Sequence, residues 1–314
     1  MSIDYFVELD KRNPQNTDGV TVHYHRLIAE GKKKDADNLR AAWSKKADKI
    51  SFSEPSNELW QMIASPTIEL NPLPPFSWFL QFTFTLTRPY ISKDDNPFYI
   101  IDNPIVRDKV FQLPMVRSTS WKGNLYSALW QLGHDKQNEE QMQRLFGEIR
   151  GEEDGKAGRL FFYPTFFTET SLEIINPHDR KRRVGKNPIL FESVPAGAHG
   201  TFSLLYVPFD LIGRDEADIR RQALEDLNLV AESLKAMFLT YGFSAKRNSG
   251  YGVAEESVND GFVQIRIKET EKPPAEVAKP VEPSEPIWLK REFDSFAGLS
   301  ELVETLLKEQ GDAQ

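Results

Sequence analysis

Hydroxyl and basic side chains gather where a helix is predicted to begin near the middle of the chain. Residues 113–123 read Leu-Pro-Met-Val-Arg-Ser-Thr-Ser-Trp-Lys-Gly, which places Ser118, Thr119, Ser120 and Lys122 close together. Backbone N–H groups and the helix dipole favour anions at a helix amino terminus, and a lysine adds positive charge. The pattern predicts a phosphate-binding site, although a helix capped by the Ser-Thr-Ser run, with a solvated lysine, accounts for the same residues.

A second basic group lies in a glycine-rich segment, Ser-Ala-Lys-Arg-Asn-Ser-Gly-Tyr-Gly, at residues 244–252. Gly250 and Gly252 allow a ligand backbone to approach closely, and Lys246 and Arg247 are suited to phosphate contacts. The alternative is a tight turn between a helix and a strand, which needs only one glycine. Two glycines beside two basic residues favour RNA binding.

The densest basic run lies at residues 178–186, His-Asp-Arg-Lys-Arg-Arg-Val-Gly-Lys, between Pro177 and Pro188. Charge runs usually form solvated loops. The net charge of the whole chain is −8, which by itself argues against nucleic acid. A local basic element on an acidic body nevertheless suits a protein that binds a polyanion at one surface.

One carboxylate, Asp102, lies in the sequence Ile-Asp-Asn-Pro-Ile-Val-Arg-Asp at residues 101–108. A carboxylate at such a position could hold a divalent cation or accept a proton from an RNA 2′-hydroxyl. An Asx turn before Asn-Pro is the alternative. Asp94 and Asp95 lie upstream in the same predicted loop and could assist with a metal. His23 and His25 lie two apart, on different sides of a helix, so a histidine metal pair is not expected.

The composition is that of a soluble globular protein: 314 residues, 39% hydrophobic and 27% charged. The absence of cysteine excludes disulfides and thiolate metal sites. The charged segment 1–10 does not resemble a signal peptide, and no apolar stretch is long enough to span a bilayer. We therefore expect a cytoplasmic protein with no membrane partner.

Hydrophobic periodicity predicts an α+β fold that positions these groups. Strands are expected at 76–86, 159–163, 200–207 and 261–267, and helices from Ser118 to about Leu132 and over 215–241. The succession strand, helix, strand, strand, helix, strand is the ferredoxin-like pattern, which RRM domains use to place RNA on a sheet. Residues 88–119 are expected to form a long irregular loop, and loops of that length are usually functional.

Four segments are predicted along the chain. Residues 1–72 form a helical extension that ends at Asn71-Pro72-Leu73-Pro74-Pro75, and residues 73–268 form the RNA-binding domain. Residues 269–287 are a linker rich in Pro, Glu and Lys. Residues 288–314 carry a C-terminal amphipathic helix, which could pack on the core or dock a neighbour.

The motifs, taken in order, resemble the RAMP (repeat-associated mysterious protein) superfamily. Ser120, Lys122 and Gly123 match its Pro-Gly-Ser-Ser-Leu-Lys-Gly motif, with Thr119 at the first Ser and departures at Arg117, Ser118 and Trp121. Three later elements of the family resemble Leu145-Phe146-Gly147 with Gly158 to Phe161, then Phe191 to Gly197, then the glycine-rich segment. The resemblance covers about residues 76–268 and implies an RRM-like domain with a β-hairpin thumb and helical extensions at both ends.

The resemblance further implies a backbone (Cas7-like) subunit of a type III CRISPR effector complex. Asp102, Pro104, Ile105 and Arg107 match the loop of its RNA-cleaving subunits, which implies Asp102 as the catalytic carboxylate and as a ligand of Mg²⁺. Segment 178–186 takes the place of the thumb that presses on guide RNA, with Ile174, Ile175 and Val184 as apolar wedges. The residues expected to bind RNA are Arg107, Ser118, Thr119, Ser120, Lys122, Arg180, Lys181, Arg182, Arg183, Lys186, Lys246, Arg247, Gly250 and Gly252.

The expected function is crRNA binding with metal-dependent endoribonuclease activity on guide-paired target RNA, alongside other Cas subunits. The first alternative is a non-catalytic capping subunit of the same complex, which the two terminal extensions favour. The second alternative is a ferredoxin-like interaction module outside CRISPR systems, which the acidic pI of about 5.4 favours.

Overall fold

The computed structural model describes most of the chain. The described residues are 17–45, 50–51, 57–94, 99–101, 103–134, 139–147, 155–176, 178–179, 184–185, 189–268 and 287–311. Asp102 and the residues predicted for the thumb, Arg180 to Arg183 and Lys186, lie outside them, as does the predicted linker except for Ile287 at its end.

A five-stranded antiparallel sheet forms the centre of the molecule, in the order β13-β12-β2-β11-β5. The strands are β2 (Trp78–Leu86), β5 (Leu160–Phe162), β11 (His199–Tyr206), β12 (Ala254–Lys268) and β13 (Ile287–Ser295). Strand β2 forms because large apolar side chains alternate along it, and Trp78, Leu80, Phe82 and Phe84 are fully buried on one face. The four predicted strands and the predicted α+β class are confirmed.

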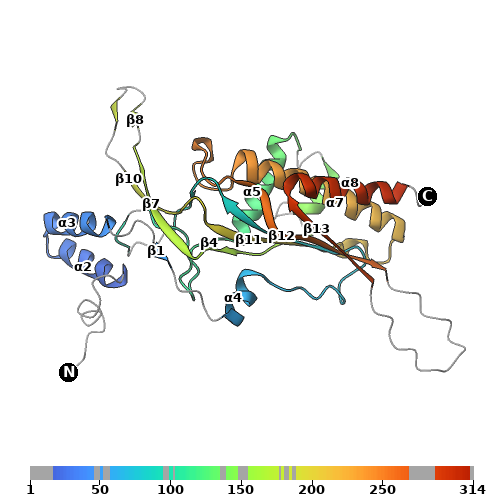
Figure 1. Cartoon of the computed structure of the whole chain (residues 1–314), viewed down its shortest axis with the longest axis horizontal. Helices are drawn as coiled ribbons and strands as arrows, with labels where there is room; N and C mark the ends of the chain where they lie inside the picture. Colours follow the sequence, from blue (N-terminus) through green and yellow to red (C-terminus); the bar gives the residue numbers. More distant parts are fainter. Residues whose placement is uncertain are drawn as a thin grey trace, which may run out of the picture.

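Three long helices cover that buried face: α5 (Ser118–Gln131), α7 (Glu216–Ala236) and α8 (Phe296–Gly311). Helix α7 continues into a π-helical turn at Met237–Tyr241. An aromatic cluster joins the layers, since Phe238 contacts the rings of Phe82, Phe84 and Trp121. Figure 1 shows these helices on one side of the sheet and α4 (Asn57–Ala64) on the other.

The C-terminal segment differs from the prediction. The sequence predicts only a helix there, but the segment begins with β13, which pairs with β12 along most of its length. The helix α8 then packs into the main core through Phe296, Leu299 and Val303. Residues 287–295 read Ile-Trp-Leu-Lys-Arg-Glu-Phe-Asp-Ser, and the consecutive charged residues 290–292 interrupt the apolar alternation that would predict a strand.

The end of the predicted N-terminal extension crosses the second face of the sheet. Leu70 packs with Phe79, Leu205 and Val207, and Ser65 Oγ donates to Gln81 Oε1 at 2.9 Å. This part of the extension therefore lies against the sheet of the predicted RNA-binding domain.

A smaller sheet lies beside the first, in the order β1-β7-β10-β3. Its strands are β1 (Ile50–Ser51), β3 (Tyr90–Ile91), β7 (Glu169–Ile175) and β10 (Ile189–Val194), and a separate pair joins β4 (Met115–Val116) to β6 (Thr165–Phe166). Beyond β7 and β10 the short strands β8 (His178–Asp179) and β9 (Val184–Gly185) pair with each other. Figure 1 shows β8 standing away from the body, at the place predicted for the thumb.

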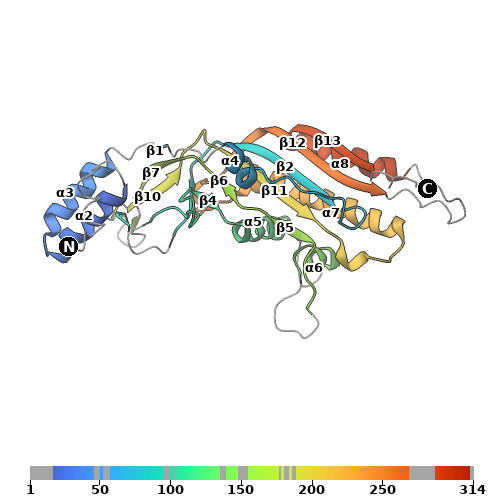
Figure 2. The ribbon, with the colours of Figure 1, turned by 90° about the horizontal axis from the view of Figure 1, so that it is seen from below.

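Two N-terminal helices, α2 (Thr17–Ala29) and α3 (Lys33–Ser44), lie at the end of the molecule opposite the C-terminus (Figures 1 and 2). Val20 and Trp43 pack on Ile100 and Ile101, in the loop before α5, with Leu172 and Leu190 of the small sheet around them. The narrow apolar stripe of α2 and α3 is thus covered within the chain. None of the helices described is long and apolar enough to cross a membrane.

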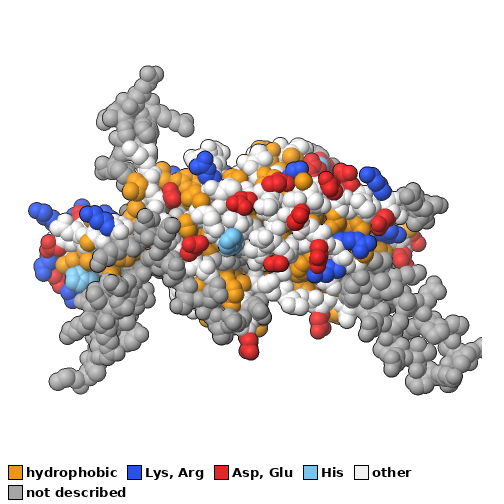
Figure 3. Space-filling view, in the orientation of Figure 1, with side chains coloured by type: hydrophobic (Ala, Val, Ile, Leu, Met, Phe, Trp, Pro, Cys, Tyr) orange, Lys and Arg blue, Asp and Glu red, His pale blue; other side chains and the backbone are white. Residues whose placement is uncertain are grey.

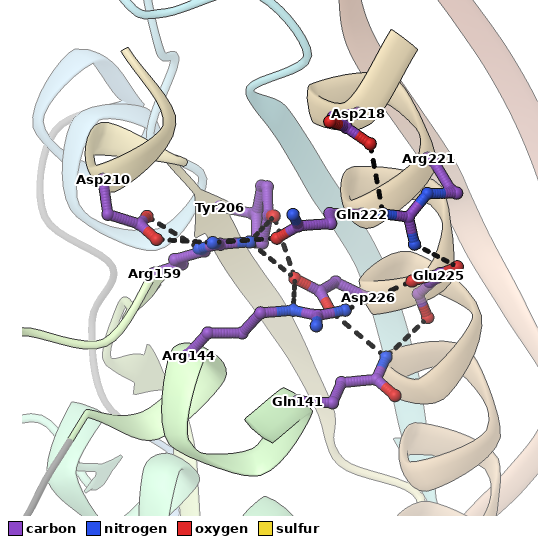
Figure 4. A network of polar contacts seen from close by, with 10 residues as sticks. All are labelled: Gln141, Arg144, Arg159, Tyr206, Asp210, Asp218, Arg221, Gln222, Glu225 and Asp226. Atoms are coloured by element: carbon purple, nitrogen blue, oxygen red, sulfur yellow. Dashed lines mark hydrogen bonds and ion pairs between the residues drawn. The ribbon is translucent and has the colours of Figure 1, made fainter. Parts of the chain in front are cut away.

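A buried polar network ties α6 (Glu140–Phe146), β5, β11 and α7 together (Figure 4). Asp226 of α7 is fully buried and accepts hydrogen bonds from Arg144, Arg159 and Tyr206. Burial raises the pKa of Asp226. The hydrogen bond and charge of Arg144, the hydrogen bond of Tyr206 and the charge of Arg159 oppose that rise. Asp226 thus pairs with both arginines inside the protein, where an unpaired charge would be costly.

Candidate nucleic-acid interface

A hollow of about 570 Å³ opens where the start of α5 meets the glycine-rich segment. Its wall comes from three parts of the chain that are far apart in sequence. The lining residues are Tyr90, Ile91, Ser92, Lys93, Val106, Arg117, Ser120, Gly123, Asn124, Phe243, Ser244, Ala245, Lys246 and Arg247. The structure therefore brings together two of the predicted motifs, Ser120 with Gly123 and Lys246 with Arg247, and adds Lys93 and Arg117, which were not predicted to bind RNA.

The glycine-rich segment is fixed to strand β3 by paired hydrogen bonds. The Ile91 N–H donates to Ser244 Oγ at 2.8 Å, and the Ala245 N–H donates to the Ile91 carbonyl at 2.9 Å. Asn124 of α5 reaches the same segment, donating to the Phe243 carbonyl at 3.1 Å. These contacts set the floor of the hollow.

The two predicted glycines differ in their surroundings. Gly252 is buried with φ +71°, and a Cβ there would lie 2.4 Å from Ser244 Cβ, so the fold itself requires this glycine. Gly250 is exposed with φ +81°, and a Cβ there would meet no atom within 4 Å. A ligand can therefore approach the backbone closely at Gly250, whereas Gly252 is needed for the conformation of the loop.

Lys246 and Arg247 are held in different ways at the rim. Lys246 is exposed in a left-handed conformation with φ 59°, and its ammonium lies 5.1 Å from the centre of the Phe191 ring. Arg247 donates to Ser127 Oγ of α5 at 3.2 Å. Neither side chain forms an ion pair with a carboxylate in the part of the chain that the structure describes.

The start of α5 corrects one prediction. The residue that caps the helix is Arg117, which makes no side-chain capping hydrogen bond, and the three hydroxyls fall within the first turn. The prediction that the Ser-Thr-Ser run caps this helix is therefore wrong, because the capping position is the residue before the run. Gly123 is exposed, and a Cβ at this position would meet nothing within 4 Å, so packing inside the protein does not explain a helical glycine.

Lys122 points away from the hollow to the end of α6. Its ammonium donates to the Phe146 carbonyl at 2.9 Å, where the last carbonyls of a helix need donors. In this arrangement Lys122 links α5 to α6, and a contact between Lys122 and phosphate stays a prediction.

The loop that carries Asp102 in sequence is held by Glu192 of β10. Arg107 donates to both carboxylate oxygens of Glu192 at 2.6 Å, and Tyr99 donates to one of them at 3.0 Å. Burial lowers the pKa of Arg107, but its bonds to Glu192 outweigh that effect and raise it. The Arg107 side chain is 12% exposed, so in this structure it serves the loop, and its contact with RNA stays a prediction.

Burial, followed by the charge of Glu192, raises the pKa of the Tyr99 hydroxyl, which therefore remains a donor. Neither Glu192 nor Tyr99 was predicted as a site residue, although Glu192 lies in a motif that supports the resemblance. The sequence carries one signal for Glu192: it is a glutamate inside the apolar strand Ile189–Val194, where a buried carboxylate needs a basic partner.

The carboxylates near the hollow do not form a metal centre by themselves. Asp94 pairs with Arg117 at 3.7 Å, and Asp108 accepts the N–H groups of Val110 and Phe111 in a turn. Asp95, like Asp102, lies outside the described residues. No group of three His, Asp or Glu residues able to hold a metal occurs within the described ranges, so a resident ion held by them does not fit.

The acidic side chains are spread over the body of the protein, as one face shows in Figure 3.

Of the predicted wedges, Ile174 is exposed and Ile175 is half-buried, near the ends of β7 and β10.

The chain belongs to the RAMP superfamily, whose family model matches residues 83–255. The predicted resemblance is therefore confirmed, and α2, α3 and β13 with α8 lie outside the matched region.

Among curated proteins, the chain is 32% identical to the CRISPR system Cms endoribonuclease Csm3 of Mycobacterium tuberculosis, over 48% of this chain and 73% of the relative. It is 26% identical to the protein of the same name from Streptococcus thermophilus, over the same shares. Its fold is similar to a chain in the cryo-EM structure of the type III-B Cmr-beta complex bound to cognate target RNA. That match has a TM-score of 0.54 and 11% identity over 83% of this chain and 99% of the other.

Proposed function

We propose that this protein is a crRNA-binding backbone subunit of a type III CRISPR effector and that it cleaves target RNA paired to the guide. The observation that carries the RNA-binding part is the hollow at the start of α5. Lys93, Arg117, Lys246 and Arg247 converge on it from three segments of an acidic protein. Four cations around one groove suit a phosphate backbone, which is bound without strong sequence preference.

A ferredoxin-like core is part of the proposal. The elements β2, α5, β5, β11, α7 and β12 follow one another in the predicted succession. Their strands take the antiparallel order β12-β2-β11-β5, in which the first and third strands are central. This arrangement supports an RRM-like platform with the thumb inserted between β5 and β11.

The cleavage part of the proposal assigns Asp102 as the catalytic carboxylate, and it is supported by the two curated relatives, which are named endoribonucleases. Asp102 would accept the proton of a target 2′-hydroxyl. The 2′-oxygen would then form a bond to the adjacent phosphorus as the bond to the 5′-oxygen breaks. The leaving oxygen would take a proton from water, and Asp102 would return its proton to the hydroxide so formed.

Metal dependence is also proposed, with Mg²⁺ as the ion. Since the described carboxylates offer no cluster of ligands, the ion would be held chiefly by RNA phosphate oxygens and water, as this ion prefers. Location in the cytoplasm, with crRNA, target RNA and other Cas subunits as partners, belongs to the same proposal.

The test uses the assembled complex with crRNA and a labelled complementary RNA. Asp102→Asn keeps the shape of the side chain and removes its charge, so the complex should assemble and bind target without cutting it. Replacing Mg²⁺ by EDTA should also stop wild-type cleavage. Cleavage by the Asn variant at the wild-type rate would refute the catalytic assignment.

A non-catalytic capping subunit is the second candidate, favoured by the α2–α3 pair and the β13–α8 unit, which lie outside the family match. Target binding by the wild-type complex without any cutting would support it. The interaction module outside CRISPR systems is not retained, because both curated relatives belong to CRISPR systems.

A further inference from the structure

Glu192 is a buried carboxylate whose two oxygens are both occupied by one loop. Its side chain is 1% exposed and projects from the middle of β10. A buried carboxylate without partners is costly, so its contacts show what the protein uses it for.

The contacts of Glu192 fall on both sides of position 102. Before it, the Tyr99 hydroxyl donates to Oε1 at 3.0 Å. After it, the Ile105 N–H donates to Oε2 at 3.0 Å, and Arg107 donates to both oxygens. The backbone takes part too, because the Glu192 N–H donates to the Asn103 carbonyl at 3.0 Å.

The same loop is also held by apolar packing. Ile100 and Ile101 are buried under Val20 of α2 and Trp43 of α3. His25 of α2 also contacts the Tyr99 carbonyl at 3.2 Å. The residues before position 102 are therefore fixed between a charged clamp and a hydrophobic one.

We propose that Glu192 is a positioning residue for RNA cleavage: it fixes the backbone on both sides of Asp102 without touching the RNA. This inference rests on the proposed function, in which Asp102 is the catalytic carboxylate. A catalytic group must be held within about half an ångström of its productive position, by neighbours that are themselves locked. Glu192 supplies that lock through Tyr99, Asn103, Ile105 and Arg107.

The experiment compares variants of the assembled complex that carry crRNA, with the complex in excess over labelled complementary RNA. Glu192→Gln keeps the volume and removes the charge that holds Arg107. Arg107→Lys keeps the charge but cannot bridge both oxygens of Glu192. Glu169→Gln is the matched control, because it removes the same charge from the neighbouring strand β7, at the end of that strand away from the pairing with Glu192.

For Glu192→Gln, we expect the maximal cleavage rate to fall about 10- to 100-fold, as for other displacements of a catalytic group, while the target Kd stays within about 2-fold. Arg107→Lys should give a smaller reduction, and Glu169→Gln none. A merely structural role would lower assembly and target binding together with the rate.

Two results would overturn the inference: cleavage by Glu192→Gln at the wild-type rate, or a weakening of target binding that equals its reduction in rate. If Glu192→Gln does not assemble, Arg107→Lys decides the matter, and a wild-type rate in that variant also overturns it. Asp102→Asn is measured in parallel. If that variant cuts normally, the proposed function has failed; if it is inactive while Glu192→Gln is normal, only the positioning role has failed.

Discussion

Two buried carboxylates, Asp226 and Glu192, use similar chemistry in different parts of the molecule. Asp226 accepts hydrogen bonds from two arginines and a tyrosine, and Glu192 from one arginine and one tyrosine. The partners of Asp226 come from helices and strands of the main core, whereas those of Glu192 come from a single loop. The same kind of cluster therefore stabilises the fold in one place and shapes a candidate site in the other.

The largest effect expected from this comparison is the disruption of the Asp226 network. Asp226→Asn removes the buried carboxylate between Arg144 and Arg159, which keep only the more exposed Glu225 and Asp210 as countercharges. The free energy of unfolding should fall by about 3–5 kcal/mol. Urea denaturation of the purified protein measures this. Asp218→Asn is the control, because its exposed pair with Arg221 should contribute less than about 1 kcal/mol. Equal losses of stability in the two variants would mean that the buried network contributes no more than the exposed pair.

A smaller decrease in stability is expected for Glu192→Gln. Only a loop is released, Arg107 can regain water when that loop opens, and a glutamine still accepts one hydrogen bond, so the free energy of unfolding should fall by about 1–2 kcal/mol. Hydrogen exchange should locate the change: the Ile105 amide, which donates to Glu192, should exchange faster, while amides of β2 stay protected. Faster exchange throughout β2 would mean that Glu192 supports the whole fold, as Asp226 does.

Basic side chains that belong to neither carboxylate cluster should have the smallest effect on stability. Replacing Lys246 and Arg247 by Ala should leave stability nearly unchanged and weaken crRNA binding. The slope of log affinity against log salt should flatten by roughly 0.7 for each phosphate that these side chains no longer neutralise. Lys235→Ala, on the exposed side of α7, is the control. Unchanged affinity and slope in the folded double variant would exclude this segment from the RNA surface.

The sequence predicts the core of this protein better than its site. Strand β2 and helix α7 carry strong apolar periodicity, so their positions follow from local patterns. The hollow also follows in part, because its motifs lie at a predicted helix start and in a predicted turn. The contact between Arg107 and Glu192 does not follow from local patterns, because these residues are 85 apart in sequence and only the folded chain brings them together.

Local patterns also mislead where tertiary contacts take over a side chain. The residue types of Ser118 to Ser120 predict a cap for α5, but the chain enters the helix one residue earlier, at Arg117. Lys122 donates a hydrogen bond to a carbonyl at the end of α6, 24 residues away, a contact that its sequence motif does not indicate, and its contact with phosphate stays a prediction. In both cases the residue types are those of an anion site, and contacts with neighbouring parts of the chain determine where the side chains lie.

The pairing of β10 has a consequence for the chemistry. Adjacent residues of a strand point to opposite faces, and here Phe191 lies under Lys246 while Glu192 holds the loop. A slip of one residue in the register of β10 would move each of these side chains to the opposite face, and so would place an aromatic ring on the side of Arg107 and a carboxylate on the side of Lys246. The ladder to β7, from Ile189↔Ile175 to Ser193↔Ser171, and the bridge Ser193↔Ile91 to β3 prevent that slip. Strand alignment in this small sheet thus decides which face is electropositive and which one clamps the loop.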